Sequence, residues 1–248
     1  MTLLVALKGT DGLVLAADSR GTFGDPRGVT AQNDSQKKAH ILSNHAAVLM
    51  SGAAELGSNV LLRYARGDSP DGVTAVMEAF RLVARQSYAE WLPHMPPAVP
   101  QGVPALPRPD LGFIVAGYDE ADNGGKREAR IYTLLSGLDF APMLHEYGFA
   151  LQGVAQYALY LLNRLYEPNR TLPELTALAV YAVTETASQD GKVGGPVRVI
   201  TIRPTDGCSE LPMASVEQII SENTQRSESL KMSFYQHEAS APEAATRE

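Results

Sequence analysis

The chain has 248 residues and carries 21 Lys and Arg against 28 Asp and Glu, so its formal net charge is −7. This length fits one large domain, because single cores stop growing at about 250–300 residues, and a hydrophobic content of 44% excludes a wholly disordered chain. The single cysteine, Cys208, excludes an internal disulfide framework and an all-cysteine metal site.

The charge balance and the apolar runs exclude further classes of protein. Basic residues are scattered, whereas a nucleic-acid surface needs clustered Lys and Arg. Apolar runs such as Leu3–Leu7 fall far short of the roughly 20 residues that span a membrane, and no basic segment precedes this one. The five histidines lack metal-ligand spacing. We therefore expect a cytoplasmic protein with no metal, cofactor, nucleic-acid or membrane partner.

Two β-hairpins are predicted at the N-terminal end of the chain. Residues 3–8 and 13–17 are apolar and are joined by 9–12 (Gly-Thr-Asp-Gly), a tight-turn sequence. A second pair of strands is predicted at Lys38–Leu42 and Ala46–Ser51. These strands are continuous apolar runs rather than alternating ones, which indicates sheets that are covered on both faces.

Helical periodicity then covers Ala54–Arg66 and Val73–Trp91, with a Gly- and Pro-containing turn between them. The next segment, Pro93–Pro109, holds seven of the 16 prolines and cannot form a helix or a central strand. It is predicted to be a surface insertion or lid, with a proline-rich ligand for another domain as the alternative.

The remaining elements complete a layered fold. Strands are predicted at Phe113–Tyr118 and Arg130–Leu135, helices at Val154–Tyr166 and Leu172–Ala187, and a last strand at Val197–Ile202. Hairpins rather than strand–helix–strand crossovers dominate this order. It favours an α/β (α+β) domain in which antiparallel sheets lie between helix layers.

The pattern weakens towards the C-terminus. One short helix is predicted at Val216–Ile220, and a polar, mobile tail from about Glu222. We therefore divide the chain into a domain over 2–205 and a C-terminal extension over 206–248.

Common catalytic motifs are missing, since neither G-x-G-x-x-G nor G-x-S-x-G occurs. Thr2, however, follows Met1, and an initiator Met is commonly removed before a small residue. A free Thr2 would combine a hydroxyl with an α-amine whose pKa is about 7.7–8, which is a nucleophile with its own general base. A threonine at this position is ordinary by itself, so the evidence must come from its neighbours.

Three predicted neighbours supply the parts that such a nucleophile needs. Asp18 follows the second strand, Lys38 opens the third, and Gly52 lies where the fourth strand enters a helix. Together they provide an acid, a cation and a backbone N–H for an oxyanion. The structural alternatives are a solvated Lys38, a plain ion pair of Asp18 with Arg20, and a glycine that only permits a turn.

The sequence here resembles the proteasome β-subunits and their bacterial relatives, which are N-terminal-nucleophile hydrolases. The resemblance lies in Thr2 and in four segments, GLVLAADSRGT (12–22), QKKAHIL (36–42), LMSGAAE (49–55) and QDGKVGG (189–195). The chain looks most like the stand-alone bacterial proteasome homologues. This resemblance implies a four-layer αββα sandwich and a threonine peptidase that cleaves peptides or unfolded proteins.

The resemblance also assigns roles to single residues. It implies Thr2 as the nucleophile, Lys38 as the neighbouring cation, Asp18 as its partner and Gly52 as the oxyanion donor. Arg20 would support the loops, and Asp190 would lie close to the N-terminal amine. A substrate pocket is implied that favours apolar side chains and is lined by Gly21, Gln36, His40, Met50 and Ala54. Two family serines are replaced here, by Gln152 and Val193.

The family assembles as stacked rings, so the resemblance implies a homo-oligomeric double ring of fourteen subunits, with twelve as the alternative. Maturation would need only the removal of Met1. The chain does not identify an unfoldase partner. Two other functions stay open, namely a catalytically silent ring scaffold, which Gln152 and Val193 would favour, and an N-terminal-nucleophile amidase that acts on a small molecule.

Overall fold

Two five-stranded antiparallel sheets form the centre of the computed structural model, which describes residues 2–25, 28–91, 108–120 and 127–235. The strand order is β10-β1-β2-β11-β12 in one sheet and β5-β6-β7-β8-β9 in the other. The first sheet consists of β1 (Leu3–Lys8), β2 (Leu13–Ala17), β10 (Phe149–Gly153), β11 (Arg198–Arg203) and β12 (Gly207–Glu210). The second consists of β5 (Ala39–Ser43), β6 (Ala46–Gly52), β7 (Leu111–Asp119), β8 (Glu128–Leu135) and β9 (Met143–Leu144).

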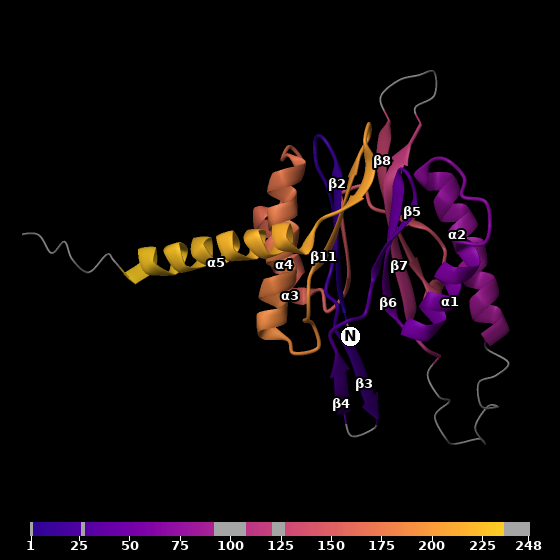
Figure 1. Ribbon diagram of the computed structural model, residues 1–248, viewed down its shortest axis with the longest axis horizontal. Coiled ribbons are helices and arrows are strands. Elements are labelled where there is room, and N and C mark those ends of the chain that lie inside the picture. The colour runs from indigo at the N-terminus through magenta and orange to yellow at the C-terminus, as the bar shows by residue number, and fades with distance from the viewer. Residues whose placement is uncertain (1, 26–27, 92–107, 121–126, 236–248) are drawn as a thin grey trace, which may run out of the picture.

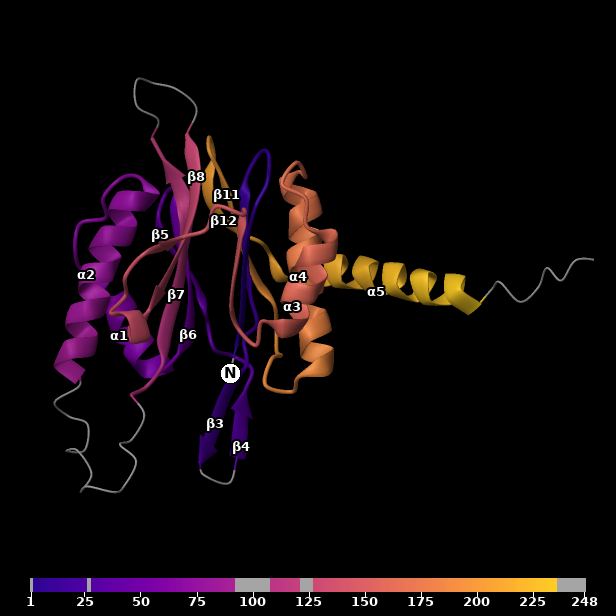
Figure 2. The same ribbon diagram turned by 180° about the vertical axis from the view of Figure 1, so that it is seen from behind.

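Helices cover the outer face of each sheet, so the layers run helix, sheet, sheet, helix (Figures 1 and 2). The second sheet is covered by α1 (Ala54–Tyr64) and α2 (Val73–Trp91), and the first by α3 (Gln156–Leu165) and α4 (Leu172–Gln189). A last helix, α5 (Met213–Tyr235), packs on α4 and then runs away from the body. The predicted αββα sandwich of antiparallel sheets is confirmed.

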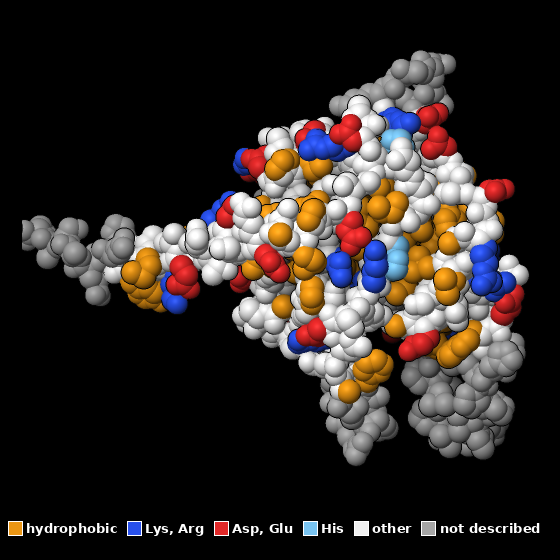
Figure 3. All heavy atoms as spheres, in the orientation of Figure 1, with side chains coloured by type: hydrophobic (Ala, Val, Ile, Leu, Met, Phe, Trp, Pro, Cys, Tyr) orange, Lys and Arg blue, Asp and Glu red, His pale blue; other side chains and the backbone are white. Residues whose placement is uncertain are grey.

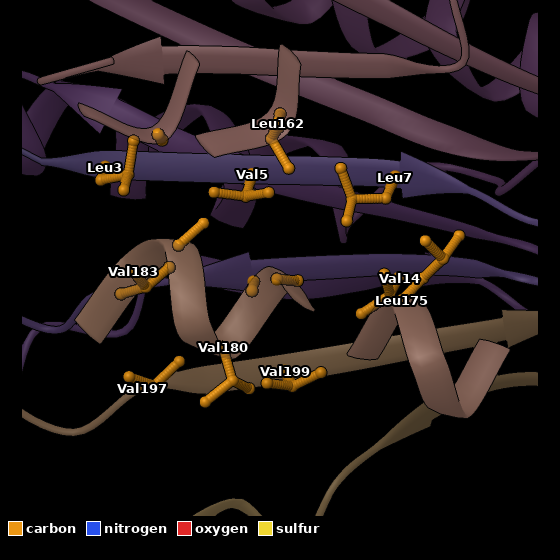
Figure 4. Close-up of a cluster of buried hydrophobic side chains, with 14 of the residues drawn as sticks. Leu3, Val5, Leu7, Val14, Leu162, Leu175, Val180, Val183, Val197 and Val199 are labelled. Carbon is orange, nitrogen blue, oxygen red and sulfur yellow. The ribbon is translucent and has the colours of Figure 1, made fainter. Parts of the chain in front are cut away.

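Successive side chains of a buried strand point to opposite faces of its sheet, so one strand contributes to two layers of the core. Leu3, Val5 and Leu7 of β1 face α3 and α4, where they meet residues such as Val183 (Figure 4). Leu4 points to the other face and belongs to the hydrophobic cluster that is packed between the two sheets. This explains why β1 is a continuous apolar run, because both of its faces are covered.

A separate two-stranded hairpin, β3 (Gly21–Asp25) and β4 (Gly28–Asn33), extends beyond one end of the sandwich (Figure 1). The label N lies at this same end, between the two sheets. The hairpin therefore adjoins the start of β1. This hairpin was not predicted, because its sequence is mostly glycine and polar residues and lacks an apolar run.

Most predicted elements appear within a few residues of their expected bounds, but several elements differ. The strands β10 and β12 were not predicted, since both are short and partly polar. The expected short helix at Val216–Ile220 is instead the 23-residue α5, which continues through the segment predicted to be a mobile tail as far as Tyr235. The proline-rich segment lies almost entirely outside the described residues.

None of the helices in the described part of the chain combines the length and the apolar character needed to cross a bilayer.

Candidate active site

A buried ion pair lies next to the first residues of β1. The Lys38 side chain is 1% exposed, and its Nζ donates hydrogen bonds to Asp18 Oδ1 at 2.8 Å and to the Arg20 carbonyl at 2.7 Å. Asp18 itself is fully buried. Burying charges is costly unless they are paired and hydrogen bonded. Lys38 is therefore a buried, paired cation and not a solvated surface lysine.

The same carboxylate also holds the N-terminal strand. The Leu3 amide donates to Asp18 Oδ1 at 3.0 Å, and the Asp18 amide donates back to the Leu3 carbonyl at 3.4 Å. Because Leu3 and Lys38 share one carboxylate oxygen, the ammonium group is held beside the Thr2–Leu3 peptide. The predicted grouping of Asp18 and Lys38 at the start of β1 is thus present in the structure.

Burial changes the acidity of the lysine. Removal from water disfavours the charged form and lowers the Lys38 pKa below its ordinary value, while the Asp18 carboxylate opposes this shift. Asp34 also favours the charged form and Arg20 disfavours it. A buried cation with a lowered pKa is the kind of group that active sites employ.

Thr2 is 6% exposed and directly precedes β1, the strand that lies between β2 and β10 in the first sheet. Its carbonyl accepts a hydrogen bond from the Val154 amide at 2.8 Å, just after β10 ends. Gly153, paired with Leu3, has a φ of +91°, and a Cβ at this position would collide with the Thr2 carbonyl oxygen. A glycine is therefore required for β10 to close around Thr2.

Arg20 joins three segments around the ion pair. Its guanidinium forms a bidentate pair with Asp34, at 2.7 and 2.8 Å, and donates to the Gly191 carbonyl at 3.0 Å. The Gly194 amide donates to Asp18 Oδ2 at 3.2 Å. The Arg20 side chain thus connects the end of β4 with the loop after α4.

Gly52 ends β6 with a φ of +94°, and α1 begins two residues later. A Cβ on Gly52 would overlap the Asp110 carbonyl oxygen, which accepts a hydrogen bond from the Ala53 amide at 2.8 Å. The strand-to-helix turn predicted here is present, and only glycine fits its backbone.

The five predicted substrate-pocket residues have different surroundings in the described part of the chain. Gly21 and Gln36 are in contact, because a Cβ on Gly21 would lie 2.9 Å from the Gln36 side-chain oxygen. His40 instead faces α1 across a cavity of about 590 Å³, where burial lowers its pKa. Met50 is only 2% exposed and its sulfur lies against α1, so it is a core residue, while Ala54 begins α1.

The surroundings of the remaining predicted positions differ from one another. The Asp190 carboxylate accepts a hydrogen bond from the Lys192 amide in its own loop at 2.9 Å. Val193, at one of the replaced serines, is completely buried in the core. Gln152 of β10 lies against Gly112 of β7, and its Oε1 is buried without a hydrogen-bond partner in the part of the chain that the structure describes.

Two contributors to the site were not predicted from the sequence. Asp34 orients Arg20, and Gly194 donates to Asp18 while leaving the space that the Arg20 guanidinium fills. The Gly194–Gly195 pair, within one of the matched segments, was the available signal. No motif singled out Asp34, since it acts through contacts made by the folded chain.

Comparison with known proteins gives bacterial proteasome beta subunits among the sequence relatives. No family model matches the chain. Proteasome subunit beta 1 of Streptomyces avermitilis is 26% identical over 234 residues, covering 88% of this chain and 74% of that protein. Proteasome subunit beta 2 of Thermomonospora curvata is 28% identical over 227 residues, with the same coverage of the two chains.

Solved structures of Anbu proteins have a similar fold. Anbu (ancestral beta-subunit) from Yersinia bercovieri superposes with a TM-score of 0.70 at 13% identity, covering 99% of this chain and all of that one. A structure described as the helical assembly of the Anbu complex from Pseudomonas aeruginosa gives 0.71 at 17% identity, covering 98% of this chain and all of that one. The chain therefore has the proteasome-like fold of the Anbu proteins, and its sequence is similar to those of bacterial proteasome beta subunits.

Proposed function

We propose that the chain is a threonine-type endopeptidase whose nucleophile is Thr2, exposed as the first residue once Met1 has been removed. The observation that carries this proposal is the buried Lys38 ammonium group, which shares an Asp18 oxygen with the Leu3 amide. A cation in this position favours the ionised form of a neighbouring hydroxyl and opposes protonation of a neighbouring amine. These are the conditions under which an N-terminal threonine reacts.

The proposed reaction proceeds through an ester on Thr2. The hydroxyl oxygen attacks a peptide carbonyl carbon, and the α-amine takes the hydroxyl proton, directly or through a water. The Gly52 amide donates to the resulting oxyanion, an interaction worth about 3–4 kcal/mol in other hydrolases. The protonated amine then gives its proton to the leaving amine, and a water hydrolyses the ester by the same path.

In this proposal the chain works inside an assembly of its own copies. Proteasome beta subunits are its sequence relatives, and a structure with its fold is described as a helical assembly. A closed chamber would admit peptides or unfolded chains, and we propose these as the substrates. A double ring of fourteen or twelve subunits is the arrangement to be tested.

A silent scaffold is the second candidate, and one observation favours it. The two positions where the family places serines near the amine hold Gln152 and Val193, and Val193 is fully buried. Proton transfer around the amine would then depend on Gln152. A scaffold of this kind would assemble but would not react.

Reaction with a threonine-directed electrophile separates these candidates. We expect one covalent adduct per chain after incubation with a peptide epoxyketone, measured by intact mass, on protein whose N-terminal residue is Thr2. Thr2→Ala should abolish the adduct, whereas Thr10→Ala, a change at an exposed threonine of the first turn, should leave it unchanged. Processed wild-type protein without an adduct would contradict the proposal and favour the scaffold.

A further inference from the structure

The backbone of Arg20 holds both members of the buried ion pair. Its amide donates to Asp18 Oδ2 at 3.1 Å, and its carbonyl accepts a hydrogen bond from Lys38 Nζ at 2.7 Å. An ammonium group carries three protons, and Lys38 gives another of them to Asp18 Oδ1. Because the group is tetrahedral, two fixed partners also fix the direction of the third proton. The position of the Arg20 carbonyl therefore determines where Lys38 directs the proton that remains for a neighbouring group.

The side chain of Arg20 is held at the base of the β3–β4 hairpin. Gly21 and Asn33 form the last pair of residues in this hairpin, so Arg20 and Asp34 lie just beyond it, next to each other. The guanidinium makes two hydrogen bonds to the Asp34 carboxylate, at 2.7 and 2.8 Å. A bidentate pair of this kind is directional as well as strong, so it fixes the plane of the guanidinium. The Arg20–Asp34 pair thus closes the open end of the hairpin.

The same hairpin is tied to the loop that follows α4. Arg20 Nη1 and Gln32 Nε2 both donate to the Gly191 carbonyl, each at 3.0 Å. A Cβ on Gly195 would lie 2.8 Å from the Cβ of Asp34, so this loop is packed directly against Asp34. The hairpin itself projects from the end of the sandwich, as the space-filling view also shows (Figure 3). Asp34 therefore lies where the base of the hairpin, the loop and the Arg20 side chain meet.

We propose that Asp34 is a positioning residue for the proposed threonine peptidase. It holds Arg20 so that the Arg20 carbonyl keeps the Lys38 ammonium group directed towards the nucleophile. This inference rests on the proposed function, because it assigns Asp34 to the same site. The Asp34 side chain is 43% exposed, whereas that of Lys38 is 1% exposed. Asp34 thus acts from the surface, through the side chain and then the backbone of Arg20.

An ordinary surface ion pair would have a different effect from a positioning pair. Exposed pairs contribute little to stability, because their charges are well solvated and holding them costs side-chain entropy. We therefore expect Asp34→Asn to leave the unfolding temperature nearly unchanged. A misplaced catalytic group, in contrast, loses much of the reaction rate even when the displacement is only about 1 Å. Loss of rate without loss of stability is therefore the result expected of a positioning residue.

The rate of adduct formation with a saturating peptide epoxyketone measures this effect, by intact mass on protein that begins at Thr2. Asp34→Asn keeps the size of the side chain but replaces one acceptor by a donor, which cannot pair with the guanidinium. We expect it to lower the rate about tenfold. Glu90→Gln is the matched control, because Glu90 of α2 makes a bidentate pair with Arg63 of α1, at 2.6 and 3.3 Å. We expect its rate to equal that of the wild type.

The pH dependence of this rate separates positioning from a general disturbance. Asp18 and Asp34 favour the protonated form of Lys38, and Arg20 is the charged group that opposes it. The Thr2 amine is neutral above about pH 8 and does not act at the alkaline limit. Removing the Asp34 charge lowers the Lys38 pKa further, so the rate of Asp34→Asn should begin to fall at a lower pH than that of the wild type. Asp34→Glu keeps the charge and should keep the wild-type limit.

The possible results distinguish this inference from the proposed function. A wild type that reacts, with Asp34→Asn reacting at the same rate and with the same alkaline limit, would overturn the inference alone. A loss of rate with a much lower unfolding temperature and an unchanged alkaline limit would make Asp34 a structural residue, and would also overturn it. A processed wild type that forms no adduct would overturn the proposed function, and this inference with it.

Discussion

Asp18 accepts four hydrogen bonds, which is as many as a carboxylate can readily take. Oδ1 accepts from Leu3 and Lys38, and Oδ2 accepts from the Arg20 and Gly194 amides. Three of these donors come from segments that are distant in sequence. The carboxylate therefore has two roles, since it fixes the cation and also aligns the backbone around it.

Substitution of both members of the pair can separate these roles. Lys38→Met leaves the buried Asp18 without its counter-ion and should lower the free energy of unfolding by about 3–5 kcal/mol, measured by denaturant titration. The double variant Asp18→Asn/Lys38→Met should recover much of this stability but form no epoxyketone adduct. A loss well under 1 kcal/mol for Lys38→Met would contradict the burial described here.

The lowered pKa of Lys38 predicts the alkaline limit of the reaction. Lys38 keeps its proton only below its own pKa, which burial moves below the ordinary 10.5. The rate of adduct formation should therefore fall as the pH rises through that lowered value. Lys38→Arg stays charged above pH 12, so whatever rate it retains should show no such fall. An unchanged wild-type rate up to pH 10.5 would exclude a role for the cation.

Among the elements, the short strand β10 helps to position Thr2. It pairs with β1 so that Leu3 lies opposite Gly153. Gly153, the last residue of β10, is packed directly against the Thr2 carbonyl. The placement of Thr2 therefore depends on a strand that comes about 150 residues later in the chain.

Alanine substitution at two glycines tests this dependence. Gly153→Ala must adopt a positive φ and also collide with Thr2, so we expect a loss of at least 1–2 kcal/mol in stability together with a slower epoxyketone reaction. Gly137→Ala is the control, since a Cβ there meets nothing within 4 Å. Equal stability of the two variants would show that β10 can shift without cost.

Elements with a strong pattern of buried residues could be predicted from the sequence. Elements whose conformation depends on contacts with distant parts of the chain could not. Continuous apolar runs located β1, β2 and β6, because both faces of these strands are covered. The strand β10 reads FALQG and has no such pattern, so only its pairing with β1 makes it a strand. At the site, Asp18 and Lys38 were predicted from their positions at the ends of predicted strands and from the matched segments, but Asp34 contributes through a contact that exists only in the folded chain.

For the whole molecule, close approach of the two sheets depends on small residues. The cluster between them includes six buried alanines, Ala6, Ala17, Ala39, Ala47, Ala116 and Ala150. Larger side chains here would push the sheets apart and would disturb the site. Asp18 directly follows β2 of the first sheet, and Lys38 directly precedes β5 of the second.

An overpacking variant tests this arrangement. Ala116→Leu adds three carbon atoms between the sheets and should cost about 1–3 kcal/mol of stability in thermal or denaturant unfolding. Ala89→Leu, at an exposed position of α2, adds the same atoms and should change stability by less than about 0.5 kcal/mol. Similar effects for both variants would mean that the sheets can separate freely.

The strand order of the first sheet also determines when the surroundings of Thr2 can form during synthesis. Its central strands β1 and β2 are synthesised first, but β1 is flanked by β10, and Asp18 receives its last donor from Gly194, 176 residues further along. A nascent chain emerging from the ribosome therefore carries Thr2 for most of its synthesis without the surroundings that would activate it. If Thr2 is the nucleophile that we propose, the order of translation would keep other newly made polypeptides from reacting with it until the sheet is closed.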